Sequence, residues 1–79
     1  NELLDIDGIE ASFVLTGVHE RVYISARSID EVNVQKIMEE FGGGGHLTVA
    51  GAQLVDVSLD EAKNIIRETL KYLKSKGDI

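Results

Sequence analysis

The sequence contains no cysteine, so it has neither a disulfide framework nor a thiolate metal site. It also contains no apolar run near the roughly 20 residues of a membrane span, and no signal-peptide pattern. Both absences are typical of a cytoplasmic domain, and we expect no direct membrane contact. The chain begins with Asn1 rather than methionine, so we expect a piece of a longer protein, in which a membrane anchor can lie elsewhere.

Basic residues are few. The 79 residues include 8 Lys and Arg against 14 Asp and Glu, which gives a net charge of −6. A protein that follows a long phosphate backbone needs a basic stripe, whereas most lysines here lie between Lys63 and Lys76. The charge therefore argues against long duplex nucleic acid as a partner. It favours a small phosphorylated ligand that is held by local donors.

Histidine is scarce as well. The only two, His19 and His46, lie far apart in the sequence. Catalysis by a metal ion needs several carboxylates and histidines that converge on the ion. We therefore expect no metal site and no catalytic residue in this chain. His19 is interpreted as a solvated loop residue rather than a metal ligand.

The first half of the chain predicts an antiparallel hairpin. Apolar and polar residues alternate over residues 9–16 and again over 21–27, which is the period of β-strands. The four residues 17–20 between them have the length of a hairpin loop. Residues 1–8 are interpreted as a linker or the end of a preceding helix.

The second half predicts two helices and a third strand. Asn33 can cap a helix in which apolar residues recur from Val34 to Phe41 at helical spacing, and Gly42 follows where a capping glycine belongs. A strand is predicted over residues 52–57, and a capping box at Ser58–Glu61 begins a helix that runs to about Lys74. The apolar face of this helix consists of Ala62, Ile65, Ile66, Leu70 and Leu73. The predicted fold is α/β, with the order β-β-α-β-α and a small mixed sheet covered by two helices over residues 9–79.

Four consecutive glycines, Gly42–Gly45, stand between these elements and are followed by His46. Ordering four glycines costs roughly 2–4 kcal/mol, a large part of the about 5–15 kcal/mol that holds a domain together. Successive backbone amides form anion-binding nests, and an imidazole adds a donor of adjustable charge. The sequence favours an anion pocket over the alternative of a flexible loop. In that pocket we expect Gly44 to need an unusual backbone angle, and residues 46–50 to form a short helical turn.

Arg27 closes the second predicted strand beside Ser28. A planar guanidinium can bind a phosphate with two parallel hydrogen bonds, as lysine cannot. It can equally well pair with one of the many surface carboxylates. The chemistry of the residue alone leaves both interpretations open.

Three motifs carry a family resemblance. Gly42–Ala50 resembles the GGGGH motif of the DHH-associated domain, first subtype, which is the C-terminal substrate-binding half of DHH phosphoesterases. Ser25–Ser28 resembles the S-x-R-S segment of that family, and Asn33-Val34 resembles its N-V helix start. The resemblance extends from about Ala11 to Leu70, most of the chain.

The resemblance implies a set of substrate-binding residues. Arg27 and Ser28 would contact a phosphate or ribose, and the amides of Gly43, Gly44 and Gly45 would face a phosphate that His46 also binds. It further implies that a DHH domain of the same chain carries manganese and the nucleophilic water, with no cofactor in this part. The chain would then be a non-catalytic part of a hydrolase.

The resemblance also indicates a substrate class. Residues 34–39 and 52–54 are most similar to membrane-anchored cyclic di-AMP phosphodiesterases, so we expect a cyclic dinucleotide as the ligand. Oligoribonucleases that act on very short RNA are the close alternative, and RecJ-like exonucleases fit the acidic charge less well. A non-catalytic RNA-binding module, as at the end of alanyl-tRNA synthetases, is a further alternative. Val49 departs from the small or polar residue of many relatives, which leaves the exact substrate open.

Overall fold

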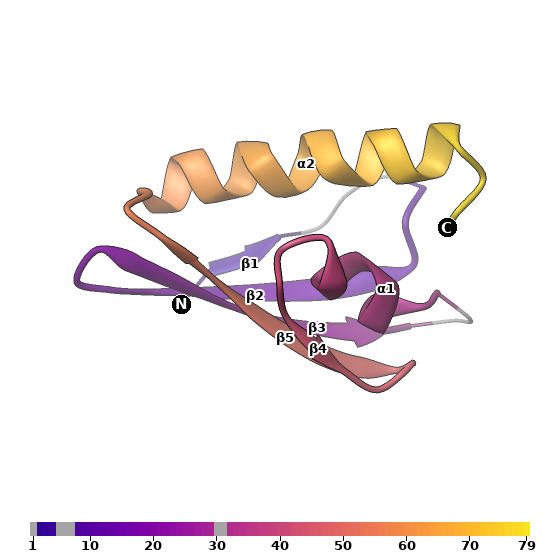
Figure 1. Ribbon diagram of the computed structural model, residues 1–79, viewed down its shortest axis with the longest axis horizontal. Coiled ribbons are helices and arrows are strands. Elements are labelled where there is room, and N and C mark those ends of the chain that lie inside the picture. The colour runs from indigo at the N-terminus through magenta and orange to yellow at the C-terminus, as the bar shows by residue number, and fades with distance from the viewer. Residues whose placement is uncertain (1, 5–7, 30–31) are drawn as a thin grey trace.

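The computed structural model describes residues 2–4, 8–29 and 32–79. The elements follow one another along the chain in this order: β1 (Glu2–Leu4), β2 (Ala11–Val18), β3 (Arg21–Ser28), α1 (Val34–Glu39), β4 (Gly44–Gly45), β5 (Val49–Val55) and α2 (Leu59–Ser75). The strands form a single sheet in the order β1-β2-β3-β5-β4 (Figure 1). The predicted small α/β fold with two helices is confirmed.

The sequence predicts a mixed sheet. Every strand pairing in the described part of the sheet is instead antiparallel. The reason is the two-residue strand β4, which the sequence analysis missed. After α1 the chain runs through β4 and turns back at once, so that β5 enters the sheet against the direction of β3. Without that turn, a helix between two neighbouring strands would favour a parallel pair.

The N-terminal segment is part of the sheet rather than a linker or helix end. Strand β1 pairs with β2, and Leu4 lies opposite Phe13 with only 4% of its surface exposed. Three residues are too short a run for the period of a strand to be read from them. The remainder of the predicted linker, residues 5–7, lies outside the described residues.

Other boundaries shift by a few residues. Strand β2 extends to Val18, so the hairpin loop is only His19 and Glu20, and His19 takes a positive φ of 56°. Helix α1 ends at Glu39 rather than Phe41. The helical turn predicted over residues 46–50 is wrong, because strand β5 begins at Val49 and is bonded on both sides.

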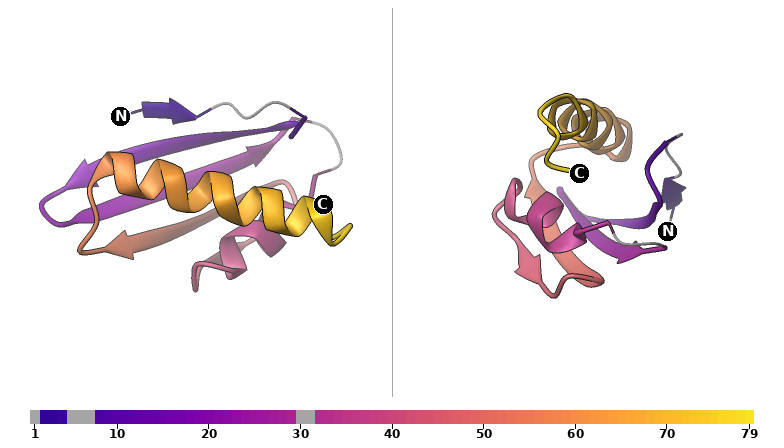
Figure 2. Two further views of the ribbon diagram at one scale, coloured as in Figure 1. Left: turned by 90° about the horizontal axis from the view of Figure 1, so that it is seen from above. Right: turned by 90° about the vertical axis from the view of Figure 1, so that its right-hand side faces the viewer.

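Both helices pack against the same face of the sheet, as the two views in Figure 2 show. The alternation of the sequence is confirmed on this face, since Phe13, Leu15, Val22, Ile24 and Ala26 are all buried against the helices. The opposite face of the sheet has no helix over it (Figure 1). Ile65, which the sequence pattern assigns to the buried face of α2, is 37% exposed.

Hydrogen bonds at both ends fix helix α2. The predicted capping box is confirmed, because the Ser58 hydroxyl accepts from the Glu61 amide at 3.1 Å and the Glu61 carboxylate accepts from the Ser58 amide at 3.0 Å. At the other end Gly77 has φ of 77°, and the Asp78 amide donates to the Leu73 carbonyl at 2.9 Å. This is the Schellman arrangement, for which a glycine is favoured. No helix among the described residues is both long enough and apolar enough to cross a membrane.

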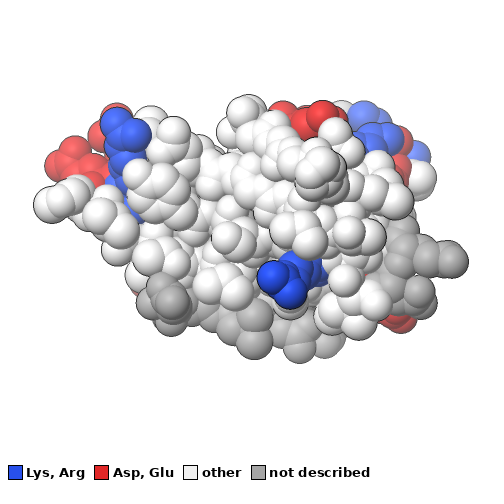
Figure 3. Space-filling view, turned by 90° about the horizontal axis from the view of Figure 1, so that it is seen from below, with Lys and Arg blue, Asp and Glu red and all other residues white. Residues whose placement is uncertain are grey.

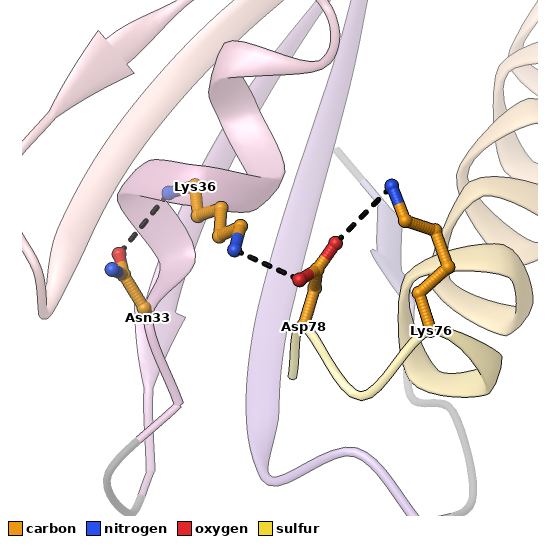
Figure 4. Close-up of polar contacts among 4 residues, drawn as sticks. All are labelled: Asn33, Lys36, Lys76 and Asp78. Atoms are coloured by element: carbon orange, nitrogen blue, oxygen red, sulfur yellow. Dashed lines mark hydrogen bonds and ion pairs between the residues drawn. The ribbon is translucent and has the colours of Figure 1, made fainter.

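Asp78 also ties the end of α2 to α1. Its carboxylate lies 3.1 Å from the Lys36 ammonium of α1 and 3.4 Å from the Lys76 ammonium (Figure 4). Asn33, which begins α1, accepts a hydrogen bond from the Lys36 amide at 3.1 Å. Hydrogen bonding to Lys36 is the main cause that lowers the pKa of Asp78 below its ordinary 3.8; partial burial opposes the shift and Lys76 adds to it.

The Asp78 cluster predicts an acid-sensitive contribution to stability. Because the pKa is lower in the folded state, the contribution is complete above the ordinary value of 3.8 and is lost as the pH falls through the folded-state pKa. We expect Asp78→Asn to lower the melting temperature at pH 7, and we expect the difference from the wild type to shrink as the pH falls below 3.8. Melting curves of both proteins across this range test the prediction. A difference that persists unchanged in acid would contradict it.

Candidate functional site

Arg27 and His46 come together on the uncovered face of the sheet. Arg27 of β3 lies directly opposite Val49 of β5. The His46 amide donates to the Val49 carbonyl at 2.7 Å, which extends the β4–β5 pairing by one residue and sets His46 opposite Val49. Residues directly opposite in an antiparallel pair share a face. The register therefore aligns His46, Val49 and Arg27 in one row across the end of the sheet.

The neighbouring row on the same face has almost no side chains. Gly44 lies opposite Gly51, and Gly51 lies opposite Ser25. These residues leave a strip of nearly bare backbone beside the row of His46, Val49 and Arg27. A ligand bound by Arg27 can therefore lie close to the main chain of three strands.

Three of the four glycines are required by the geometry. Gly42 takes φ of 79° where α1 ends, the position the sequence predicts for a capping glycine. A Cβ on Gly43 would overlap the Gly51 carbonyl and lie 2.6 Å from the Cβ of Ala52, and one on Gly45 would lie 2.6 Å from the Cα of Ala50. Gly44 has open space and no positive φ, so the special backbone requirement predicted for it belongs to its neighbours.

The glycine amides do not form a continuous nest. The Gly43 amide donates to the Met38 carbonyl at 2.9 Å, so it is not free to face a phosphate as predicted. Bonded and non-bonded pairs alternate along an antiparallel ladder. Since His46 bonds Val49, Gly45 is in a non-bonded pair with Ala50, and its amide points away from β5 to the outer edge of the sheet. Gly44, the next residue along, directs its amide at β5.

Ser28 and Arg27 have different surroundings, because neighbouring strand residues point to opposite faces. The Ser28 hydroxyl accepts from the Val32 amide at 3.1 Å and the Ser28 amide donates to the Thr48 carbonyl at 2.9 Å. Both bonds hold loops in place. Arg27 is exposed, and within residues 2–4, 8–29 and 32–79 no hydrogen bond or ion pair engages its guanidinium. The alternative interpretation, in which Arg27 pairs with a surface carboxylate, has no support among the residues of that part of the chain.

Among the described residues, the uncovered face carries little charge. Figure 3 shows the molecule from this side: a basic side chain stands within a largely uncharged surface, and the other charged side chains in view, of both signs, lie toward its rim. The described part of the chain holds no group of three or more histidine, cysteine, aspartate or glutamate residues that could bind a metal ion. As far as these residues go, an anion on this face would meet arginine and backbone donors without a nearby carboxylate cluster.

Sequence reasoning gave no role to Arg21, Tyr23 and Gln53 on this face. Arg21 and Tyr23 alternate with Arg27 along β3, and Gln53 lies opposite Tyr23. The alternation that begins at Arg21 was the signal that could have found them, since it puts both residues on the side of Arg27.

These features define a small α/β domain, built on an antiparallel sheet with helices on one face and, on the other, the row of His46, Val49 and Arg27 beside a glycine-lined strip. The sequence matches the family model of the DHHA1 domain over residues 1–74, and the chain belongs to this family. The resemblance that the GGGGH, S-x-R-S and N-V motifs carry is therefore confirmed.

Curated relatives agree with this assignment. The cyclic-di-AMP phosphodiesterase GdpP of Geobacillus thermodenitrificans is 54% identical over 69 residues, which cover 86% of this chain and 10% of the relative. The cyclic-di-AMP phosphodiesterase PdeA of Listeria monocytogenes is 46% identical over 76 residues, or 94% of this chain and 12% of the relative. An A-adding tRNA nucleotidyltransferase of Geobacter sulfurreducens is 35% identical over 80 residues, 95% of this chain and 9% of the relative. The chain thus spans about a tenth of the length of these proteins.

The glycine geometry predicts opposite results for two neighbouring substitutions. Gly43→Ala forces a Cβ into the backbone of β5 and should lower the free energy of unfolding by about 1–3 kcal/mol, as overpacking does. Gly44→Ala should leave it unchanged or raise it by up to about 1 kcal/mol, because the only effect is to restrict the unfolded chain. Urea unfolding of the two variants measures the difference. Equal losses in both would contradict the assignment of the close contact to Gly43.

Proposed function

We propose that this domain is the substrate-binding part of a DHH phosphodiesterase and holds a phosphate of cyclic di-AMP. The observation that carries the proposal is the row of His46, Val49 and Arg27 on the uncovered face. Arg27 supplies a planar fork that can bind two phosphate oxygens at once. The His46 imidazole and the outward amide of Gly45 supply the further donors.

The position of these groups suits a compact anionic ligand. Arg27 is a local positive charge on a face whose acidic residues lie toward the rim (Figure 3). The net charge of −6 means that attraction must come from this local arrangement, since the chain as a whole repels anions. This favours a compact ligand with few phosphates over an extended strand, whose binding would need many cations.

Hydrolysis is assigned to another part of the parent protein. In our proposal a DHH domain outside this chain binds manganese, which would activate the attacking water when bound there. Nothing in the described residues offers the three or more ligands of such a site. The task of this chain is to hold and orient the substrate. We place it in the cytoplasm, in a parent protein anchored to the membrane by a segment elsewhere.

A very short oligonucleotide is the second candidate ligand. The bifunctional oligoribonuclease and PAP phosphatase NrnA of Thermus thermophilus is 36% identical over 66 residues, 84% of this chain and 20% of the relative. The higher identity to the two cyclic-di-AMP phosphodiesterases, 54% and 46%, favours the cyclic dinucleotide. A role in binding long RNA, as the tRNA nucleotidyltransferase relative suggests, is disfavoured by the acidic net charge.

Arg27→Lys tests the phosphate fork. The change keeps the charge but removes the bidentate geometry, so binding of cyclic di-AMP should weaken by about 1.5–3 kcal/mol, roughly 10- to 100-fold. Arg67→Lys is the matched control, because Arg67 is an exposed arginine on α2, which covers the opposite face of the sheet. Titration calorimetry of the 79-residue chain gives both affinities. Equal affinities for the Arg27 variant and wild type would overturn the proposed contact.

The division of labour is tested by an activity assay. The 79-residue chain, incubated with manganese and either cyclic di-AMP or the linear dinucleotide pApA, should release no product detectable by chromatography. The control is a full-length cyclic-di-AMP phosphodiesterase such as the Geobacillus relative under the same conditions. Cleavage by the chain alone would show that it contains the reactive centre itself.

A further inference from the structure

A hollow of about 530 Å³ lies beside the glycine run, at the end of β4. Its lining combines the aromatic ring of Tyr23, the amide of Gln53 and the guanidinium of Arg21 with the bare backbone of Gly43 and Gly51. No acidic side chain among the described residues lines it. Gly51 lines the hollow and also belongs to the strip of Gly44, Gly51 and Ser25 beside the phosphate site, so the hollow and the phosphate site adjoin.

We infer that this hollow receives a purine base of the same ligand, with Tyr23 as the surface on which the base stacks. The inference rests on the proposed function, because it takes the position of the phosphate at Arg27 as given. It adds the residues that would distinguish a nucleotide from any other phosphorylated molecule.

The spacing along β3 fits one nucleotide. Tyr23 and Arg27 share a face and are four residues apart, or about 13 Å at the rise of a strand. This separation is comparable to the length of a nucleotide from its phosphate to the far edge of its purine, plus the length of the arginine side chain that extends toward the phosphate. Ser25 and Gly51 lie between them and present no large side chain that would block a flat ring. Tyr23 is 45% exposed, so its ring is accessible.

Gln53 supplies the polar groups that read a base edge. It lies directly opposite Tyr23, and its side-chain oxygen accepts from the Arg21 guanidinium at 3.3 Å. That bond leaves the amide NH₂ free to donate toward a base nitrogen. Residues of β5 bond β3 and β4 alternately, and β4 ends before it reaches Gln53. The backbone N–H and C=O of Gln53 therefore point outward from the open edge of β5, where they are a further donor and acceptor.

This combination is typical of nucleobase recognition. An aromatic face provides stacking energy, and adjacent amide donors and acceptors match the edge of a base. A second phosphate would bind less well, because Arg21, the one cation among the described lining residues, already donates a hydrogen bond to Gln53. A purely apolar ligand would leave the polar groups of Gln53 without partners.

The test compares AMP with ribose 5-phosphate, which has the same phosphate but no base. Both are titrated into the 79-residue chain and followed by the NMR signals of its backbone amides and arginine side chains. We expect AMP to bind roughly tenfold tighter, the usual effect of stacking one base. Tyr23→Leu should abolish the preference without weakening ribose 5-phosphate, and Tyr23→Phe should retain it. Tyr72→Leu is the matched control, since Tyr72 is an exposed tyrosine on α2.

The outcomes separate this inference from the proposed function. If ribose 5-phosphate shifts the Arg27 signals but AMP binds no tighter, the base site is wrong and the phosphate site stands. If neither probe shifts those signals, the proposed function is wrong, and the base site is wrong too because it depends on a phosphate bound at Arg27. A preference for AMP that survives Tyr23→Leu also overturns the role of Tyr23. Should that variant not fold, Gln53→Ala is the second variant, and it must lower the preference for AMP.

Discussion

The close approach of the glycine run to strand β5 is the contact on which the candidate site depends. Gly43 and Gly45 bring one main chain so near another that a single added carbon would overlap it. Because of this approach the chain can form β4, turn at once and enter the sheet as β5. The same turn sets His46 opposite Val49, and so in one row with Arg27, which lies on the other side of Val49. The glycines therefore act through the backbone path that they permit, more than through amides that they expose.

The arrangement of the helices determines where a ligand can bind. Both helices cover one face of the sheet and bury its apolar residues, and Asp78 fastens the end of one helix to the other (Figures 2 and 4). The other face stays open and carries a polar and aromatic set on alternate positions of β3 and β5. One run of alternating residues thus supplies the core with one half of its side chains and the binding face with the other half.

Local patterns in the sequence predicted much of this structure. The inward residues of the hairpin, the capping box of α2 and the capping glycine Gly42 were all predicted, because each depends on neighbours in the chain. Strands β1 and β4 were missed, because two or three residues carry no readable period and are recognised as strands only from their pairing. Arg27 and His46 were proposed as site residues from the sequence and lie in one row of the sheet, whereas the hydrogen bonds of Ser28 and Gly43 depend on register. A register is a long-range property that no local motif contains.

The brevity of β4 has a second consequence. A strand at the border of a sheet exposes unpaired peptide groups and can recruit a strand from another molecule. At this border the chain offers only two paired residues, Gly44 and Gly45, before it turns into β5. Strand β4 is too short to offer a neighbouring molecule enough unpaired peptide groups for edge-to-edge strand pairing. The outward peptide group of Gly45 can thus stay unpaired with another strand at a stretch of border that is too short to promote aggregation.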